Sequence, residues 1–152
     1  MEFSSFYAPA LLCLALFMMG FSRATPSQEA SENPLPECPD SPNCARESFY
    51  FERPTAEIFD KAQTTLQEMN AETAEVAQEL SADTPGELKA VFRIRIFRFR
   101  DDVHIAVVPA GESGQHAWLH IRSASRTGYS DLGVNARRVS TFSETLKKQL
   151  NS

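Results

Sequence analysis

The feature that most restricts the fold is the stretch at residues 121–138, where a strand-like run breaks into a polar turn and then into a helix start. It reads Ile-Arg-Ser-Ala-Ser-Arg-Thr-Gly-Tyr-Ser-Asp-Leu-Gly-Val-Asn-Ala-Arg-Arg and holds four arginines, three serines, an Asp and an Asn. An ordinary linker does not need that density of charge and hydrogen-bonding groups. We therefore expect a strand to pass directly into a helix here, with the polar residues between them as the first candidates for a functional site.

A helix with one buried face is expected after Pro54, a residue that is acceptable in a first helical turn. Its apolar side chains recur at three- and four-residue spacing, at Ile58, Phe59, Ala62, Leu66 and Met69. The same spacing continues through Thr73, Val76 and Leu80, and the Ala, Glu and Gln residues between them favour helix. The local pattern alone therefore extends this helix to about residue 80.

Aromatic and β-branched residues predict strands over residues 88–99, 102–108 and 116–124, after a turn at Asp83-Thr84-Pro85-Gly86. The first strand changes parity, because Phe92, Ile94 and Ile96 alternate with arginines whereas Phe97 and Phe99 take the other parity. Such a switch predicts a β-bulge or sharp bend near residue 97, with Phe97 turned toward the core.

The C-terminal helix is expected to begin at Asn135, a good N-cap residue. Its apolar stripe consists of Val139, Phe142, Leu146 and Leu150. Helix and strands in this order are typical of an α+β domain, in which an antiparallel sheet is covered on one face.

Two signatures resemble those of one known family. The run Cys38-Pro-Asp-Ser-Pro-Asn-Cys44 is similar to the N-terminal signature of domain-of-unknown-function family 1499, and residues 121–138 are similar to its C-terminal signature. The resemblance implies that the first helix ends near Asn70 and that residues 74–80 form a strand, which gives an antiparallel sheet of about four strands covered by two helices. The chain departs from the family pattern after Cys44, where it reads Ala-Arg-Glu, and the family carries no established activity.

The N-terminal residues are typical of an export signal, because residues 10–21 are uninterruptedly apolar and small residues follow at Ser22 and Ala24. The expected organisation is a signal peptide over residues 1–24, a polar, disordered tether over residues 25–37 and one α+β domain over residues 38–152. The chain is then exported and periplasmic or associated with the cell envelope. An uncleaved membrane anchor is the alternative, since no Lys or Arg precedes the apolar run. With the signal cleaved, no stable transmembrane span is expected.

Cys38 and Cys44 are the only cysteines beyond the apolar run, and export makes a disulfide between them chemically available. Free thiols remain an alternative. A metal site is the third reading, but two thiols with five residues between them lack the further ligands that zinc requires. We expect no metal and no cofactor.

Charge is unevenly distributed along the chain. Residues 25–87 carry 14 acidic and 3 basic side chains, whereas residues 88–152 carry 5 acidic and 11 basic ones. One interpretation is that the two halves compensate each other within a solvated domain. The other is an exposed basic face that meets a small anion or an envelope component, such as phospholipid headgroups or an acidic glycan. Nucleic acid is a poor partner for an exported acidic chain, and no recognition motif is present.

The stretch at residues 121–138 favours the second interpretation, because Arg137 and Arg138 fall in the first turn of the predicted helix, where the dipole disfavours cations. Asp131 or an external anion could compensate for them. The candidate ligand-binding residues are Arg122, Ser123, Ser125, Arg126, Tyr129, Ser130, Asp131, Asn135 and Arg138. In the structural alternative, Asp131 pairs with Arg126 or Arg138 and the glycines only shape the turn.

Two functional hypotheses follow. The first is a non-catalytic envelope protein whose strand-turn-helix segment binds an anionic ligand or partner. The second is a small enzyme of unknown reaction that uses Asp131 or His120 as acid or base. The run Gly128-Tyr-Ser-Asp-Leu-Gly133 does not have the spacing of a hydrolase nucleophile elbow. A hairpin centred on residue 112 would place His104 opposite His120, but two histidines alone make a weak metal site.

Overall fold

The computed structural model describes residues 31–82, 84–94, 99–111 and 114–152 of the chain. The expected signal segment, the first six residues of the expected tether and the bend at Phe97 lie outside the described residues. Within the described part, no helix is long and apolar enough to cross a membrane.

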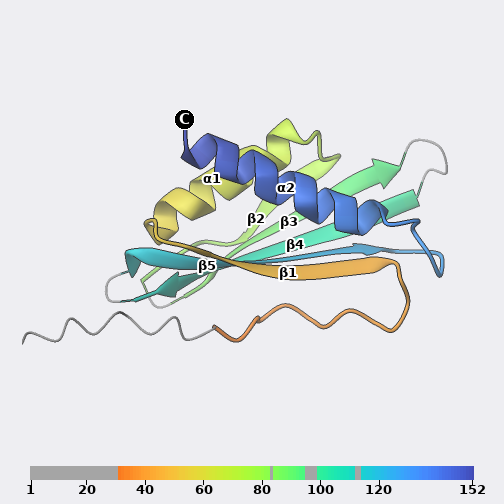
Figure 1. The fold of residues 1–152 in the computed structure, drawn as a ribbon, viewed down its shortest axis with the longest axis horizontal. Coiled ribbons are helices and arrows are strands. Elements are labelled where there is room, and N and C mark those ends of the chain that lie inside the picture. Colours follow the sequence, from red (N-terminus) through yellow and green to blue (C-terminus); the bar gives the residue numbers. More distant parts are fainter. Residues whose placement is uncertain (1–30, 83, 95–98, 112–113) are drawn as a thin grey trace, which may run out of the picture.

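Five antiparallel strands form one sheet in the order β1-β5-β4-β3-β2. The elements are β1 Cys44–Phe51, α1 Thr55–Glu68, β2 Thr73–Gln78, β3 Gly86–Ile94, β4 Phe99–Ala110, β5 His116–Ser125 and α2 Val134–Leu150. Both helices lie on the same face of the sheet, and none of the described residues forms a helix on the other face, which we call the helix-free face (Figure 1). The expected α+β class is confirmed, with one strand more than the four expected.

The additional strand is β1, which pairs with β5 from Cys44 opposite Ala124 to Phe51 opposite Ala117. Phe49 and Phe51 pack against the core on the helix face. Apolar packing therefore stabilises β1 in addition to its backbone hydrogen bonds with β5. The sequence pattern predicted no strand between Cys44 and the first helix. The alternation of large apolar residues there consists of Phe49 and Phe51 alone, which is too short to indicate a strand.

The expectation that the first helix stops near Asn70 is confirmed. Asn70 adopts a left-handed backbone with φ of 58°, a conformation that ends helices and that asparagine tolerates. Residues 73–78 then form β2, the edge strand paired with β3. The helical spacing of residues 73–80 is therefore misleading, because pairing to β3 outweighs a weak local preference.

The single strand expected over residues 88–99 is instead divided between two strands. The ladder of β3 and β4 pairs Ile94 with Phe99 and Arg93 with Arg100, so residues up to 94 and residues from 99 onward belong to two antiparallel strands. The antiparallel register accounts for the change of parity between Phe92 and Phe99, because these two residues lie on different, paired strands.

The register of β4 and β5 also differs from the expected one. His120 is opposite Ala106, and His104 is opposite Arg122. The hairpin is thus centred one residue later than expected, and the two histidines are not cross-strand partners.

The core lies between the helices and the inner face of the sheet. It is made of the apolar stripes of the helices and of alternate strand residues, including Ile58, Leu66, Ile105, Leu119, Ile121, Phe142 and Leu146. Gly86 allows α1 to approach β3 closely, because a Cβ there would lie 2.5 Å from Phe59 Cε2 and 3.0 Å from Leu80 Cβ.

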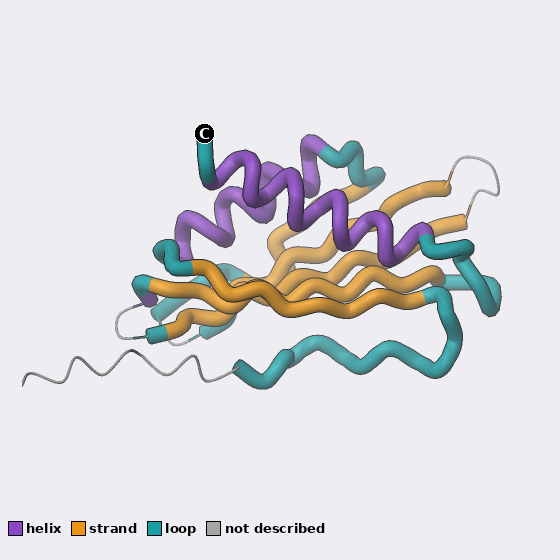
Figure 2. Tube along the Cα trace, viewed as in Figure 1, coloured by secondary structure: helices purple, strands orange, loops and turns teal. Residues whose placement is uncertain are grey.

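Residues 31–43, which we name the strap, run along β1 on the side of the sheet away from the helices (Figure 2). The Cys38–Cys44 disulfide joins the strap to the start of β1. Leu35 is buried, and the Arg46 guanidinium donates to the carbonyl oxygens of Asn33 and Leu35 at 2.9 and 3.0 Å. Residues 31–37 were expected to belong to the disordered tether; the structure instead packs Leu35, and for residues 25–30 the tether stays a prediction.

We expect Gly86→Ala to lower the free energy of unfolding by about 1–3 kcal/mol, as overpacking against Phe59 does. Urea unfolding measures the change. The double variant Gly86→Ala, Phe59→Leu should lose less stability than the sum of the two single changes, because the smaller side chain makes room for the new methyl group. Strictly additive losses would show that Phe59 does not press on Gly86.

Candidate functional site

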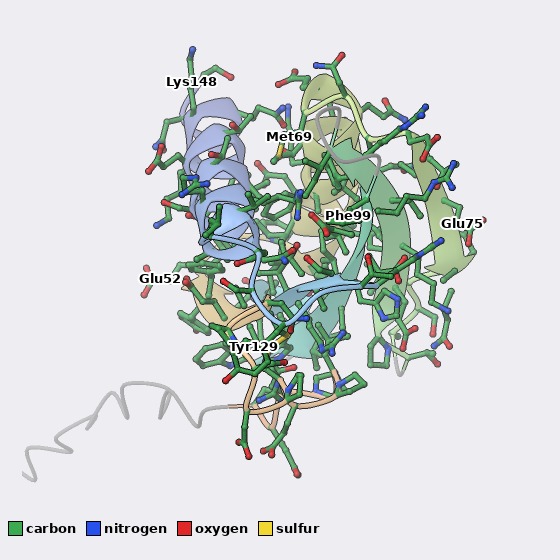
Figure 3. All side chains as sticks on the ribbon, turned by 90° about the vertical axis from the view of Figure 1, so that its right-hand side faces the viewer. Glu52, Met69, Glu75, Phe99, Tyr129 and Lys148 are labelled. Carbon is green, nitrogen blue, oxygen red and sulfur yellow. A yellow bond between two sulfur atoms is a disulfide. The ribbon has the colours of Figure 1, made fainter. Side chains whose placement is uncertain are left out.

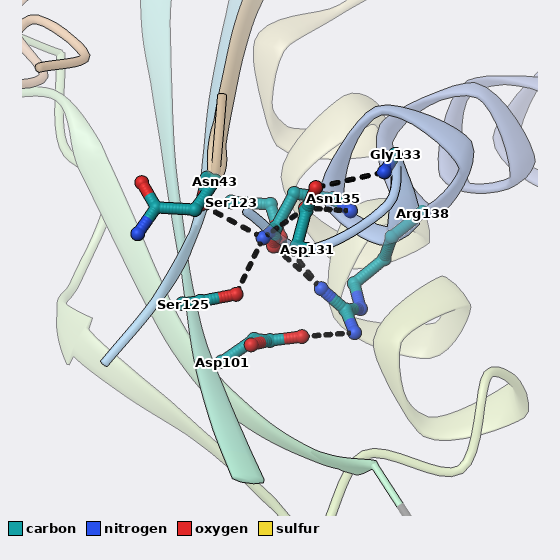
Figure 4. Close-up of polar contacts among 8 residues, drawn as sticks. All are labelled: Asn43, Asp101, Ser123, Ser125, Asp131, Gly133, Asn135 and Arg138. Atoms are coloured by element: carbon teal, nitrogen blue, oxygen red, sulfur yellow. Dashed lines mark hydrogen bonds and ion pairs between the residues drawn. The ribbon is translucent and has the colours of Figure 1, made fainter. Parts of the chain in front are cut away.

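The strand-turn-helix segment forms a polar network at the junction of β5 and α2, which we call the corner and define as residues 121–138 (Figure 4). Asn135 is its hub and is fully buried. Its side-chain amide donates to the carbonyl of Asn43, to Ser125 Oγ and to Asp131 Oδ2, and its oxygen accepts from Ser123 and Arg138. Asn135 is not the N-cap as expected, because Gly133, with φ of 77°, precedes the first helical residue.

The two signatures of the sequence meet at this network. Asn43, from the Cys38–Cys44 segment, accepts hydrogen bonds at its carbonyl from Asn135 Nδ2 and from the Ser125 N–H. Its side-chain amide also donates to the carbonyl of Gly128. Segments more than 80 residues apart in the chain therefore form one structure.

Asp131 caps the N-terminus of α2 and does not pair with an arginine. Its carboxylate accepts from the Gly133 N–H at 2.8 Å, the Asn135 N–H at 2.7 Å and the Asn135 side chain at 2.6 Å. Partial burial works to raise the pKa of Asp131, but the N–H groups of Asn135 and Gly133 outweigh it and hold the pKa below its ordinary value. The expected pairing of Asp131 with Arg126 or Arg138 is wrong, because the helix N-terminus takes the carboxylate.

The partners of those arginines are two adjacent residues of β4 that the sequence analysis missed. Arg138 donates to Asp101 at 2.7 Å, and the side chains are 10% and 0% exposed. Arg126 binds Asp102 at 2.7 Å, with 48% and 36% exposure. Because neighbouring strand residues point to opposite faces, Asp101 is directed toward α2 and Asp102 away from it.

The exposed part of the corner is residues 126–133, which we call the tip. Tyr129 and Leu132 are 76% and 80% exposed, and Tyr129 projects from the end of the molecule (Figure 3). The tip is nevertheless held in place: Ser130 Oγ accepts the Leu132 N–H, and Arg137 donates to the Leu132 carbonyl at 3.1 Å. Leu132 has φ of 54°, an uncommon conformation for a branched side chain.

The structure divides the candidate ligand-binding residues into three groups. Ser123, Ser125, Asp131, Asn135 and Arg138 share the internal network, whereas Arg126, Tyr129 and Ser130 lie on the tip. Arg122 is on the opposite face of the sheet, where it is paired in register with Arg46. That these residues bind a ligand stays a prediction.

His120, the other candidate acid or base, lies on the helix-free face and is fully buried. Its Nδ1 is 2.8 Å from Ser48 Oγ, and its ring stacks on Trp118 with centroids 6.1 Å apart. Burial, with a smaller contribution from the Arg46 guanidinium, lowers the pKa of His120 to about 4. Neutral imidazole is therefore its form at physiological pH. No group of His, Cys, Asp or Glu in the described part of the chain is arranged to hold a metal ion.

The fold and the corner together define a small α+β domain with a disulfide-linked strap and a polar strand-turn-helix junction. The chain belongs to the family described as "Protein of unknown function (DUF1499)", whose model matches residues 34–146. No curated protein is detectably similar to it.

Several solved structures are similar in part. A START superfamily protein from Mycobacterium smegmatis is 8% identical, with 72% of this chain and 97% of that chain covered and a TM-score of 0.42. A conserved protein from Geobacillus kaustophilus is 11% identical, with 71% and 95% covered and a TM-score of 0.39. The protein TTHA0849 from Thermus thermophilus is 12% identical, with 69% and 94% covered and a TM-score of 0.34. Likeness at these scores supports no inference about function.

Asp101 and Asp131 should differ in their contribution to stability. We expect Asp101→Asn to lower the free energy of unfolding by about 3–5 kcal/mol, because it leaves the buried Arg138 without a counter-charge. Asp131→Asn should cost about 1 kcal/mol, since it weakens a helix cap that is partly exposed. Denaturant unfolding of both variants measures the difference. Equal losses would contradict the assignment of Asp101 as the partner of Arg138.

His120 should make stability depend on pH. Because its pKa is about 4 in the folded protein and 6.5 ordinarily, the unfolded chain binds more protons between these values. The stabilisation from neutral His120 is therefore complete above about pH 6.5 and falls by about 3 kcal/mol as the pH drops to 4. Unfolding measured from pH 4 to 7 should show a flatter profile for His120→Gln. Ser48→Ala keeps the imidazole and should keep the slope; a parental slope in His120→Gln would exclude His120 as its source.

Proposed function

We propose that this protein is a non-catalytic binding module and that the corner is the surface that receives its ligand or partner. The observation that carries the proposal is the exposure of Tyr129 and Leu132 on a tip that hydrogen bonds hold in place. Exposed apolar side chains that lie together on a surface mark interaction sites, and aromatic side chains are frequent binding anchors. The left-handed conformation of Leu132 adds a local cost that is typical of functional segments.

The anionic group of the ligand would contact Arg137, whose exposed side chain is bonded to the Leu132 carbonyl. Arg126 is also exposed, but an anion would compete there with Asp102, which already pairs with it. Arg138 is not available to it, because Asp101 already pairs with this buried guanidinium. Asp131 likewise occupies the helix N-terminus, the other place where an anion would bind. We therefore place the anion at the surface of the tip. An amphiphilic partner with one anionic group and an apolar part fits this combination of side chains.

The enzyme alternative gains no support from the two candidate groups. Asp131 accepts three hydrogen bonds that stabilise its charged form, and this disfavours proton transfer near neutral pH. The pKa of His120 is about 4 and its Nδ1 is already bonded to Ser48 Oγ, so the imidazole is a poor general base near neutral pH.

We further propose that the protein is located in the cell envelope. The Cys38–Cys44 disulfide is compatible with an oxidising compartment, where such bonds persist. The ligand would then be a small anion or a component of the envelope, as the unequal charge of the two halves of the chain also suggests.

The test is ligand-induced thermal stabilisation of the full chain at low salt, with phosphate, sulfate, glycerophosphate and galacturonate as probes. We expect at least one probe to raise the melting temperature of the parent. Arg137→Ala should remove most of that rise, and Asp131→Asn should increase it, because an internal competitor is lost.

Two further variants complete the design. Leu132→Ser should weaken binding of an amphiphilic probe such as lysophosphatidylglycerol, with a change in unfolding free energy within about 0.5 kcal/mol. Lys148→Ala is the matched control, since this cation lies at the opposite end of the same helix (Figure 3), and it should respond like the parent. If none of the probes stabilises the parent, or if Arg137→Ala and Leu132→Ser behave like Lys148→Ala, the corner is not the binding surface.

A further inference from the structure

A row of basic side chains crosses the helix-free face of the sheet. Arg46 of β1 is opposite Arg122 of β5, Arg122 is opposite His104 of β4, and His104 is opposite Lys89 of β3. Directly opposed residues of antiparallel strands point to the same face, so the four side chains stand side by side. Arg46 and Arg122 are a like-charge pair at the closest cross-strand position, an arrangement that is destabilising by itself.

No acidic side chain among the described residues forms a salt bridge with either arginine of this pair. The Nε atoms of Arg46 and Arg122 are buried and have no hydrogen-bond partner within the described part of the chain. Arg46 is oriented by the strap, whose carbonyl oxygens accept from its Nη2. The site therefore has an excess of fixed donors and a deficit of acceptors, which buried polar groups rarely tolerate.

His120 lies two residues before Arg122 in β5, so its side chain is on the same face of the sheet and adds another hydrogen-bond donor there. Asn33 donates to Ser48 Oγ at 3.1 Å, so the Ser48 hydroxyl hydrogen is free to be donated to His120 Nδ1 at 2.8 Å. The proton of the neutral imidazole then lies on Nε2, which is buried and has no partner in the described residues. The side chain itself is 0% exposed, so this unpaired donor is not satisfied by the bulk solvent.

We propose that Arg46, Arg122 and His120 form a second binding site, for a phosphate-type oxyanion, on the helix-free face beside the strap. Two guanidinium groups that no acidic side chain of the described residues pairs with match the double charge of a phosphomonoester better than the single charge of a carboxylate. The oxyanion accepts from the buried Nε atoms and from His120 Nε2, and it separates the charges of the opposed arginines. Arg122 belongs to the corner by residue number, but it lies on the opposite face of the sheet from the Asn135 network, so this site is separate from the tip.

Titration of the isotopically labelled full chain with inorganic phosphate, followed by amide NMR, distinguishes the two surfaces. We expect shift changes in residues 46–48 and 120–122, separate from any change in the tip. Arg122→Gln should weaken the first set of changes at least tenfold. Arg137→Gln, the control at the corner, should leave them unchanged whether or not the corner binds anions. Acetate at equal ionic strength should produce no comparable response.

Stability gives a second readout that does not require the ligand. Without phosphate, Arg122→Gln should melt at the same temperature as the parent or higher, because it removes one member of a like-charge pair. Arg138→Gln, which breaks a compensated pair, should melt several degrees lower. Arg122→Lys keeps the charge and loses the planar fork, so it should fold and bind phosphate more weakly than the parent.

The source of the phosphate is resolved by cosedimentation with vesicles. Binding to vesicles that contain phosphatidic acid, whose headgroup is a phosphomonoester, supports a lipid headgroup if Arg122→Gln abolishes it and if phosphatidylcholine alone shows none. A response to free phosphate alone supports a soluble phosphomonoester. The proposal is overturned if neither probe binds, if Arg122→Gln binds like the parent, or if Arg122→Gln melts as low as Arg138→Gln.

Discussion

The buried ion pair between Arg138 and Asp101 is the interaction on which the placement of α2 against the sheet depends. The guanidinium binds Asp101 of β4, Ser123 of β5 and Asn135 of its own helix, and it lies over the Phe92 ring of β3 at 4.8 Å. One side chain therefore fixes the helix relative to three strands. A buried charge without its partner costs far more than the pair contributes when intact, so this network requires all of its members.

That requirement explains the composition of the corner. A helix that carries Arg137 and Arg138 near its start has an unfavourable interaction with its own dipole. Asp131 offsets the dipole by accepting the free N–H groups, and Asp101 offsets the buried arginine. Because Asp101 and Asp131 compensate for Arg138 and the helix dipole internally, within the corner the tip is the part that remains exposed to other molecules. The density of polar residues in this segment thus has a structural cause, and the exposed apolar side chains are the better indication of binding.

The helices and most strands could be predicted from the sequence, because periodicity and turn residues report local structure directly. The end of α1 could not, because its periodicity continues to about residue 80, and only the resemblance to the family implied a stop near Asn70. The strand β1 could not, since Phe49 and Phe51 are its only large apolar residues on the core face and too few to reveal an alternating pattern. The partners of Arg126 and Arg138 could not either, because Asp101 and Asp102 are adjacent and only the register assigns each to a face. That Arg122 and Ser123 lie on opposite faces of the sheet could have been predicted from the sequence, because consecutive residues of a strand point to opposite faces.

The strap connects the two surfaces for which we propose binding. At its C-terminal end Asn43 joins Asn135 and Gly128 of the corner, and a few residues earlier its carbonyl oxygens orient Arg46 on the helix-free face. The disulfide shortens the path between these contacts by joining Cys38 to the first residue of β1. A ligand that displaced the strap from Arg46 would therefore act on the segment that also supports the tip. Coupling between the surfaces requires only that the strap has two arrangements with different affinities for the two ligands.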